Sequence, residues 1–175
     1  MDVRRLGSAA MAGGAGLIVA NVLMLVNADA RGLESTGDWL VVSVLGVAVL
    51  LTLAGLLGVH LRERAAYGKL GRAAIALAFV GQAVGGFANI RLGELGALVA
   101  VVSGLVGFVL LTFAIARAPV LPAWSGYLLL VGWVGLYALG DGDLGIALDG
   151  VAWLVVGYAL MAEWATAPVR EPSLA

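Results

Sequence analysis

The stretch GIALDGVAWLVVGYALMAEW, residues 145–164, is apolar apart from Asp149 and Glu163. Its length matches the roughly 17–25 residues that an α-helix needs to cross the hydrocarbon core of a bilayer. Apolar side chains occupy every side of such a helix, whereas a membrane β-strand would alternate apolar and polar residues. The stretch therefore predicts a membrane-spanning helix that carries one carboxylate, Asp149, inside it.

Five more segments of the same kind precede this stretch. We predict helices over residues 7–27, 39–60, 73–90, 96–116, 123–139 and 144–163. The chain is 62% hydrophobic and only 12% charged, whereas soluble domains are roughly 45–50% apolar and about 25% charged. Short connections make neighbouring helices antiparallel. The predicted fold is all-α integral membrane: residues 1–175 form a single domain, a six-transmembrane-helix bundle, in contact with the lipid bilayer.

Positive charge is distributed unevenly between the predicted connections. The N-terminus, the second connection (residues 61–72), the fourth connection and the C-terminal tail hold eight of the ten Lys and Arg residues: Arg4, Arg5, Arg62, Arg64, Lys69, Arg72, Arg117 and Arg170. The positive-inside rule then places both termini in the cytoplasm, and we expect a prokaryotic plasma membrane. Ala28 and Ala30 form an A-x-A motif, but the preceding apolar run is long for a signal peptide, so we expect an uncleaved helix.

Composition excludes several kinds of site within a single chain. There is no cysteine and one histidine, which excludes disulfides, iron–sulfur clusters and multi-histidine metal sites. The net charge of −1 and the lack of a basic run give no basis for nucleic-acid binding. The only lysine, Lys69, lies outside the predicted helices, so a retinal Schiff base is not expected. We expect no cofactor and no bound metal.

An enzymatic role is also not expected. The stretch Gly140-Asp141-Gly142-Asp143 matches the G-x-G-D pattern of intramembrane aspartyl proteases. It falls in a predicted connection, however, and no second helix carries the partner Asp that a catalytic dyad needs. An enzyme acting on lipid would likewise lack a cysteine, a histidine cluster and a carboxylate pair.

Polar side chains recur at one depth in the outer half of the predicted bundle, on the order of 6–12 Å from the outer boundary at 1.5 Å rise per residue. They are Asn21, Ser43, Gln82, Ser103 and Asp149, and Asn89 could join them. An ionised Asp in a helix centre costs ~2.5–3.5 kcal/mol on insertion scales. No Lys or Arg within a predicted helix can pair with Asp149, so it needs hydrogen-bonding partners, hydration or protonation.

Two functional interpretations remain open. The first is a small transporter or channel with an outward-facing polar pocket, in which Asp149 binds a cation or proton. In this interpretation Trp153, one turn from Asp149, forms a wall, and the remaining lining residues are Asn21, Gln82 and Ser103. The second is a non-catalytic subunit or scaffold that packs on a second copy or on another membrane protein through glycine-rich faces. Each has a non-functional counterpart. Asp149 could form a structural clasp, meaning polar contacts that only hold helices together, and the glycines could serve ordinary tight helix packing.

Overall fold

The computed structural model describes residues 2–26, 36–87, 93–117, 120–139 and 144–162. These residues form six α-helices and no strand: α1 (Val3–Val26), α2 (Thr36–Glu63), α3 (Gly68–Phe87), α4 (Gly93–Arg117), α5 (Trp124–Ala138) and α6 (Leu144–Met161). The all-α prediction is confirmed, and each predicted segment coincides with one helix. By length and composition, α1, α2, α4 and α6 can each cross a membrane, and α5 is apolar but shorter.

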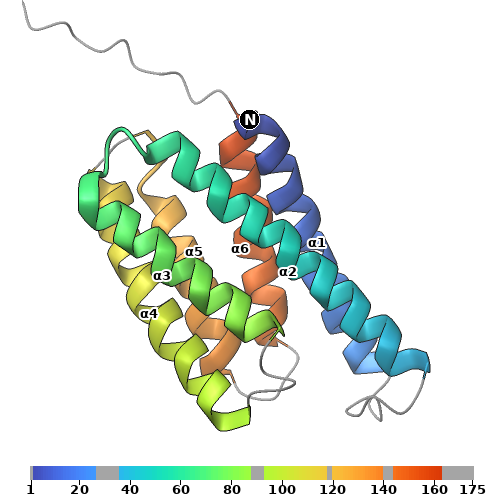
Figure 1. Ribbon diagram of the computed structural model, residues 1–175. Coiled ribbons are helices and arrows are strands. Elements are labelled where there is room, and N and C mark those ends of the chain that lie inside the picture. The colour runs from blue at the N-terminus through green and yellow to red at the C-terminus, as the bar shows by residue number, and fades with distance from the viewer. Residues whose placement is uncertain (1, 27–35, 88–92, 118–119, 140–143, 163–175) are drawn as a thin grey trace, which may run out of the picture.

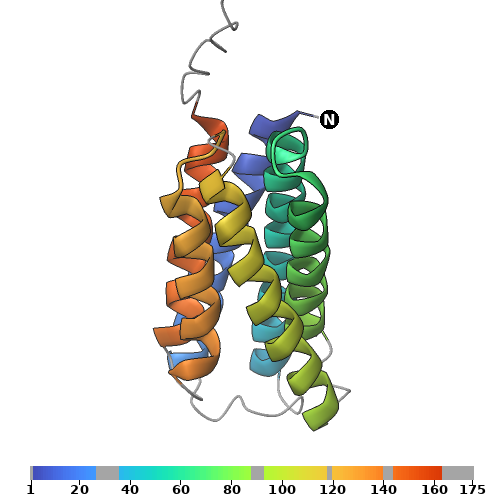
Figure 2. The same ribbon diagram turned by 90° about the vertical axis from the view of Figure 1, so that its left-hand side faces the viewer.

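The helices alternate in direction and form a closed ring (Figures 1 and 2). Each helix packs on its neighbour in the chain, α6 packs on α1 to close the ring, and α2 also touches α6. The start of α1 and the ends of α2, α4 and α6 lie at the same end of the bundle (Figure 1). We call this the basic end, because it holds every Lys and Arg in the described part of the chain: Arg4, Arg5, Arg62, Arg64, Lys69, Arg72 and Arg117.

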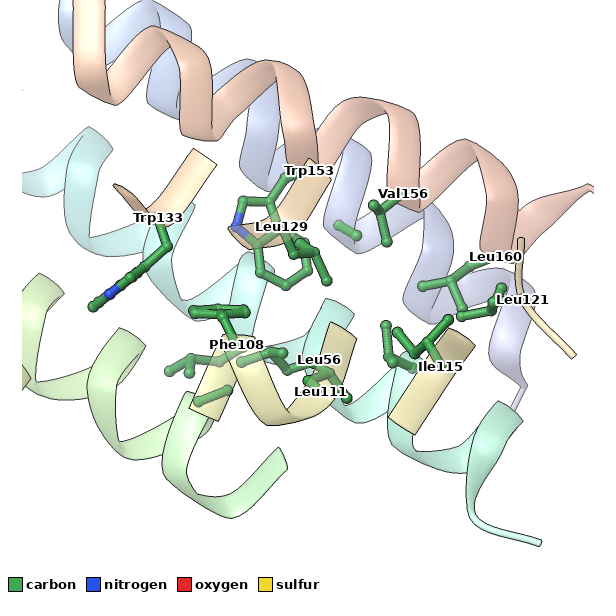
Figure 3. Packing of buried hydrophobic residues seen from close by; sticks show 14 of the residues in the cluster. Leu56, Phe108, Leu111, Ile115, Leu121, Leu129, Trp133, Trp153, Val156 and Leu160 are labelled. Carbon is green, nitrogen blue, oxygen red and sulfur yellow. The ribbon is translucent and has the colours of Figure 1, made fainter. Parts of the chain in front are cut away.

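The interior and much of the outer surface are both apolar. Figure 3 shows the interior, where Leu56, Leu111 and Val156 are all fully buried between helices. On the outside, Leu50 and Leu98 are 57% and 60% exposed. A water-soluble bundle would instead present polar side chains on its outer face. The chain is therefore a polytopic membrane protein, with lipid contacting its exposed apolar side chains.

Glycines allow the helices to approach closely. A Cβ atom on Gly14 of α1 would lie 2.4 Å from the carbonyl oxygen of Gly150 in α6, and one on Gly81 of α3 would lie 2.4 Å from Cα of Gly104 in α4. Both distances are shorter than any real carbon contact, so larger residues would push these helices apart. Small residues at helix contacts are typical of membrane bundles. These glycines are thus used in contacts within the chain.

The connection between α2 and α3 is shorter than predicted. The helix α2 continues to Glu63 and α3 begins at Gly68, so the predicted connection of residues 61–72 reduces to residues 64–67. Gly68 has a φ of +61°, a conformation that glycine adopts without steric cost. Apolar residues mark only the part of a helix that contacts hydrocarbon, while its backbone hydrogen bonds continue into the polar interface. Glu63 consequently lies in the last turn of a helix rather than in a loop.

Candidate functional site

Asp149 lies in the second turn of α6 and faces the interior of the ring. It is only 2% exposed. The backbone of α5 passes beside it, because Gly132 has no side chain: a Cβ atom there would lie 3.0 Å from Oδ1 of Asp149. Since α6 ends at the basic end, Asp149 sits in the opposite half of the bundle, away from the described Lys and Arg residues. The structure thus places a carboxylate inside the protein, without a basic side chain beside it in the described residues.

Gln82 and Trp153 are the hydrogen-bonding side chains that interact with the Asp149 carboxyl. The Trp153 contact is not an ordinary hydrogen bond, because Trp153 Nε1 is buried without a partner, and the amide oxygen of Gln82, Oε1, is also buried without a partner. A hydrogen bond fixes the orientation of the Gln82 amide: its nitrogen, Nε2, donates to Thr52 Oγ1 at 3.1 Å. Thr52 in turn donates to the carbonyl of Val49 in its own helix at 2.9 Å. A polar row therefore runs across three helices, from Asp149 on α6 through Gln82 on α3 to Thr52 on α2.

The other two predicted pocket residues are not joined to this row by a hydrogen bond. Asn21 is buried in α1, and its Oδ1 atom has no hydrogen-bond partner among the described residues. Ser103 is partly exposed, and its hydroxyl donates to the carbonyl of Val99 one turn earlier in α4. Ser43 is exposed. Asn89, Asp141 and Asp143 lie outside the described residues.

The site around Asp149 has no cluster of metal-ligand side chains among the described residues, and it contains buried polar atoms that lack hydrogen-bond partners. Within the described part of the chain, no three residues among His, Cys, Asp and Glu are grouped as metal ligands would be. Asp149 is the only carboxylate of the polar row, because the other members are Gln82 and Thr52. A buried polar atom without a partner costs about 1–3 kcal/mol, and Gln82 Oε1 and Trp153 Nε1 are both of this kind. Unpaired polar groups of this kind in a native protein call for an explanation, and functional use is one.

A pocket of about 240 Å³ opens on the outer side of the bundle, between α4 and α5, and was not predicted. It is lined by Val101, Leu105, Trp133, Val134, Tyr137 and Ala138. Tyr137 extends from this pocket toward α3: its hydroxyl lies over Gly85, where a Cβ atom would be 2.5 Å away. Trp133 and Tyr137 are four residues apart in the chain, so they lie on one face of α5. This spacing is the only feature of the sequence that could have indicated the aromatic side of the pocket.

A second polar cluster lies at the basic end. The Glu63 side chain is fully buried; Oε1 accepts a hydrogen bond from the backbone N–H of Leu121 at 2.6 Å, while Oε2 has no partner in the described residues. Nearby, the Tyr67 hydroxyl and His60 Nδ1 form a hydrogen bond. Burial, and secondarily the charge of Glu63, raise the pKa of Tyr67 to about 12, with Arg72 acting in the opposite direction. Glu63 was missed from sequence, because its partner comes from a distant connection.

Comparisons of the chain with protein-family models, with curated proteins and with solved structures find no match. Function must therefore be inferred from the membrane character of the bundle and from the chemistry around Asp149. The relevant facts are the burial of Asp149, its separation from basic residues, and its contacts with Gln82 and Trp153.

Proposed function

We propose that the protein is a small transporter or channel of a prokaryotic plasma membrane, in which Asp149 binds a proton or a monovalent cation. One observation carries the proposal: the carboxylate of Asp149, 2% exposed, lies inside an apolar bundle away from the described Lys and Arg residues. Ionisable groups inside membrane proteins are rare and mark ion pathways and proton relays. A role of this kind requires no catalytic group, so we propose a non-enzymatic protein.

The chemistry of the neighbours supports a cation or proton as the ligand. An isolated buried carboxylate is strongly unfavourable until it gains a proton or a positive partner. Gln82 brings a second oxygen, Oε1, which is buried and has no hydrogen-bond partner. Because Gln82 Nε2 is held by Thr52, the amide oxygen is the free end of that side chain. Two oxygen-bearing groups from α6 and α3 are thus available to one small cation.

We also propose that all six helices cross the membrane, with both termini in the cytoplasm. The support is that α3 and α5 each pack between two of the long apolar helices, so they share the depth of those helices. The described Lys and Arg residues gather at the end where α1 starts and α6 ends, and positive charge is enriched on the cytoplasmic side. In this orientation Asp149 belongs to the outer half of the bundle.

The alternative function, a scaffold that packs on a partner through glycine-rich faces, has less support. It needs glycines that are free to contact another protein. Gly14 and Gly150 instead face each other across the α1–α6 contact, and Gly81 and Gly104 face each other across the α3–α4 contact. The same glycines cannot also form an outward docking face.

The test is ion flux into proteoliposomes that contain the purified protein. Protons are followed with an internal pH dye and other monovalent cations by current on a solid-supported membrane. We expect flux for the wild type and a loss of at least about tenfold for Asp149→Asn, since removing one carboxylate removes the charge that attracts the cation. The matched control is Glu94→Gln, the same chemical change at an exposed position of α4, which should leave flux unchanged.

The measurement separates a functional Asp149 from a structural one. Thermal unfolding of both variants is recorded in the same lipid. A folded Asp149→Asn protein with full wild-type flux would overturn the proposal. A wild type with no flux for any cation tested, together with an Asp149→Asn variant that unfolds at lower temperature, would assign Asp149 to a structural clasp.

A further inference from the structure

We propose that α3 and α4 move together as a gate, which opens at the end of the bundle opposite the basic end and admits the ligand to Asp149. The two helices, here called the α3–α4 hairpin, pivot at the basic end against the other four helices. This inference rests on the proposed function, because it describes how the ligand reaches that carboxylate.

The chain attaches the hairpin to the rest of the bundle at one end. The helix α3 begins at the basic end, directly after the short connection of residues 64–67, and α4 returns to the same end, where it leads to α5 (Figures 1 and 2). At the far end, the end opposite the basic end, α3 leads to α4 itself. The other four helices are held together without the hairpin, through the contacts α1–α2, α1–α6, α2–α6 and α5–α6. The basic end is therefore the fixed end of the hairpin, and its far end has no covalent link to the other helices.

The two helices of the hairpin are in backbone contact with each other. A Cβ atom on Gly81 of α3 would lie 2.4 Å from Cα of Gly104. A Cβ atom on Gly107 of α4 would lie 2.2 Å from the backbone nitrogen of Ala78. Small residues permit such close approach of helix backbones. Because no side chain separates the helices at these two contacts, the hairpin moves as one body.

A contact of the same kind joins the hairpin to α5 near the basic end. A Cβ atom on Gly126, in the first turn of α5, would lie 2.7 Å from Cα of Thr112. The Thr112 hydroxyl donates to the carbonyl oxygen of Gly126 at 2.9 Å. The bond between Glu63 Oε1 and the N–H of Leu121 holds the connection between α4 and α5 in place. These contacts form the pivot, since hinges lie at a few positions near the ends of elements.

Further from the basic end, the hairpin meets α5 through side chains instead. Gly104 faces the indole of Trp133, where a Cβ atom would be 2.1 Å away, and Gly85 faces the Tyr137 hydroxyl. The pocket of about 240 Å³ lies in this same contact between α4 and α5, so the packing there is incomplete. Side chains can change rotamer, and the pocket leaves them room to do so. The hairpin is thus held loosely toward the far end and tightly at the pivot.

A hydrogen bond closes the hairpin against α2. Gln82, in the last two turns of α3, donates through Nε2 to Thr52 Oγ1 at 3.1 Å. Gln82 is 3% exposed and also interacts with Asp149, which lies in the second turn of α6, toward the far end. Movement of the far end away from α2 breaks the bond to Thr52 and withdraws Gln82 from the carboxylate. Asp149 then becomes accessible from the far end.

The experiment measures distances between spin labels by double electron–electron resonance on the protein in nanodiscs; the natural chain has no cysteine to remove. Leu98→Cys on α4 and Leu144→Cys on α6 place labels toward the far end, at exposed residues. The matched control pairs Phe113→Cys with Tyr158→Cys, exposed residues of the same two helices near the basic end.

Both label pairs are compared with and without Thr52→Val, which removes the acceptor of Gln82 and leaves Gln82 and Asp149 unchanged. We expect the far-end pair to show a second, longer distance. Its population relative to the shorter one should rise about threefold in Thr52→Val, the factor that corresponds to one interhelical hydrogen bond in a membrane. The basic-end pair should give one distance that the substitution does not change.

Access to position 149 is measured separately, as the rate at which trimethylammonioethyl methanethiosulfonate, a small cationic thiol reagent, modifies Asp149→Cys. Because the reagent requires the open form, this rate should also rise about threefold when Thr52→Val is added. The control is Val156→Cys, which is fully buried on the same helix, about two turns closer to the basic end, and should stay unmodified.

Three results would overturn the inference: one far-end distance that Thr52→Val leaves unchanged, equal changes in the two label pairs, or equal modification of Asp149→Cys and Val156→Cys. Flux that depends on Asp149, combined with one unchanging far-end distance, would leave the proposed function standing and remove the gate. Opening of the far end in a protein whose flux does not depend on Asp149 would overturn the proposed function and, with it, the role of the gate in ligand access.

Discussion

The carboxylate of Glu63, at the end of α2, accepts a hydrogen bond from the backbone N–H of Leu121, 58 residues further along the chain, at 2.6 Å. The two residues are 0% and 2% exposed. The bond ties the connection between α4 and α5 to the end of α2, two elements that are not neighbours in the ring. Glu63 also accepts backbone hydrogen bonds from Ala66 and Tyr67 through its own carbonyl oxygen, so it organises the basic end from both its backbone and its side chain.

Replacing Glu63 with alanine should destabilise the bundle. The substitution leaves the buried Leu121 N–H without an acceptor, which costs about 1–3 kcal/mol. Glu63→Gln keeps an acceptor oxygen at the same position and should lose less. The measurement is thermal unfolding in nanodiscs. Glu94→Ala, at an exposed carboxylate of α4, is the control. Equal melting temperatures for Glu63→Ala and Glu94→Ala would contradict the role given to the Leu121 bond.

The bond between Gln82 and Thr52 should appear as a coupling free energy between α3 and α2. We expect a double-mutant cycle of Gln82→Leu and Thr52→Val to give about 0.5–1.5 kcal/mol, the range of interhelical hydrogen bonds in membranes. Thr112→Val is the matched control, because the Thr112 hydroxyl bonds to carbonyls of Phe108 and Gly126 and not to Gln82. A cycle of Gln82→Leu with Thr112→Val should be additive. Equal coupling in the two cycles would show that the Thr52 bond does not act specifically.

The number and position of the helices could be predicted from sequence because each apolar run is long enough to have only one interpretation. The position of Asp149 within the last helix was also predictable, although the side of the helix on which it lies was not. The run from Val151 to Ala162 is too short to span a membrane, so the helix had to include the turn that holds Asp149.

The rotation of each helix could not be predicted. These helices are apolar on all sides, so the sequence does not show which side faces lipid. Gln82 and Ser103 looked alike at their depth, yet Gln82 lies inside and bonds to α2, whereas Ser103 is partly exposed and bonds to its own helix. Glu63 and Tyr137 were missed for a related reason. Their importance comes from partners on other helices, which no local pattern reveals.

Gly14 and Gly150 should be intolerant of even a methyl group. A Cβ atom at Gly14 would lie 2.4 Å from Gly150 O, and one at Gly150 would lie 2.7 Å from Gly14 O. Backbone atoms cannot move away easily, so Gly14→Ala should destabilise the α1–α6 contact by about 1–3 kcal/mol. The control is Gly135→Ala, whose nearest neighbour would be the flexible end of Leu148 at 3.3 Å. There the higher helix propensity of alanine, about 1 kcal/mol, should offset the crowding. A stabilised Gly14→Ala protein in thermal unfolding would disprove the close approach.

The stability of the folded protein should fall in strongly alkaline solution, partly through Tyr67. Its pKa is raised from 10.0 to about 12 in the folded state by burial and by Glu63. The folded state therefore keeps a proton that the unfolded state loses, so this contribution is complete below pH 10 and disappears as the pH rises toward 12. Two pKa units correspond to ~2.7 kcal/mol at most. Phenylalanine cannot ionise, so Tyr67→Phe should show a flatter loss of stability between pH 10 and 12. Parallel curves for the two proteins would refute this assignment.

The proposed orientation can be tested without background labelling, because the natural chain has no cysteine. Ala66→Cys places an exposed thiol in the connection between α2 and α3 at the basic end, and Leu139→Cys places one after α5 at the opposite end. A membrane-impermeant maleimide added to intact cells should label Leu139→Cys and spare Ala66→Cys until the cells are opened, since positive charge is retained on the cytoplasmic side. The reverse pattern would invert the bundle and place Asp149 in the inner half, so that its ligand would be taken up from the cytoplasmic side. Labelling of both thiols in intact cells would instead show that an odd number of the helices between them fails to cross the membrane, and the short helix α5 would be the first to examine.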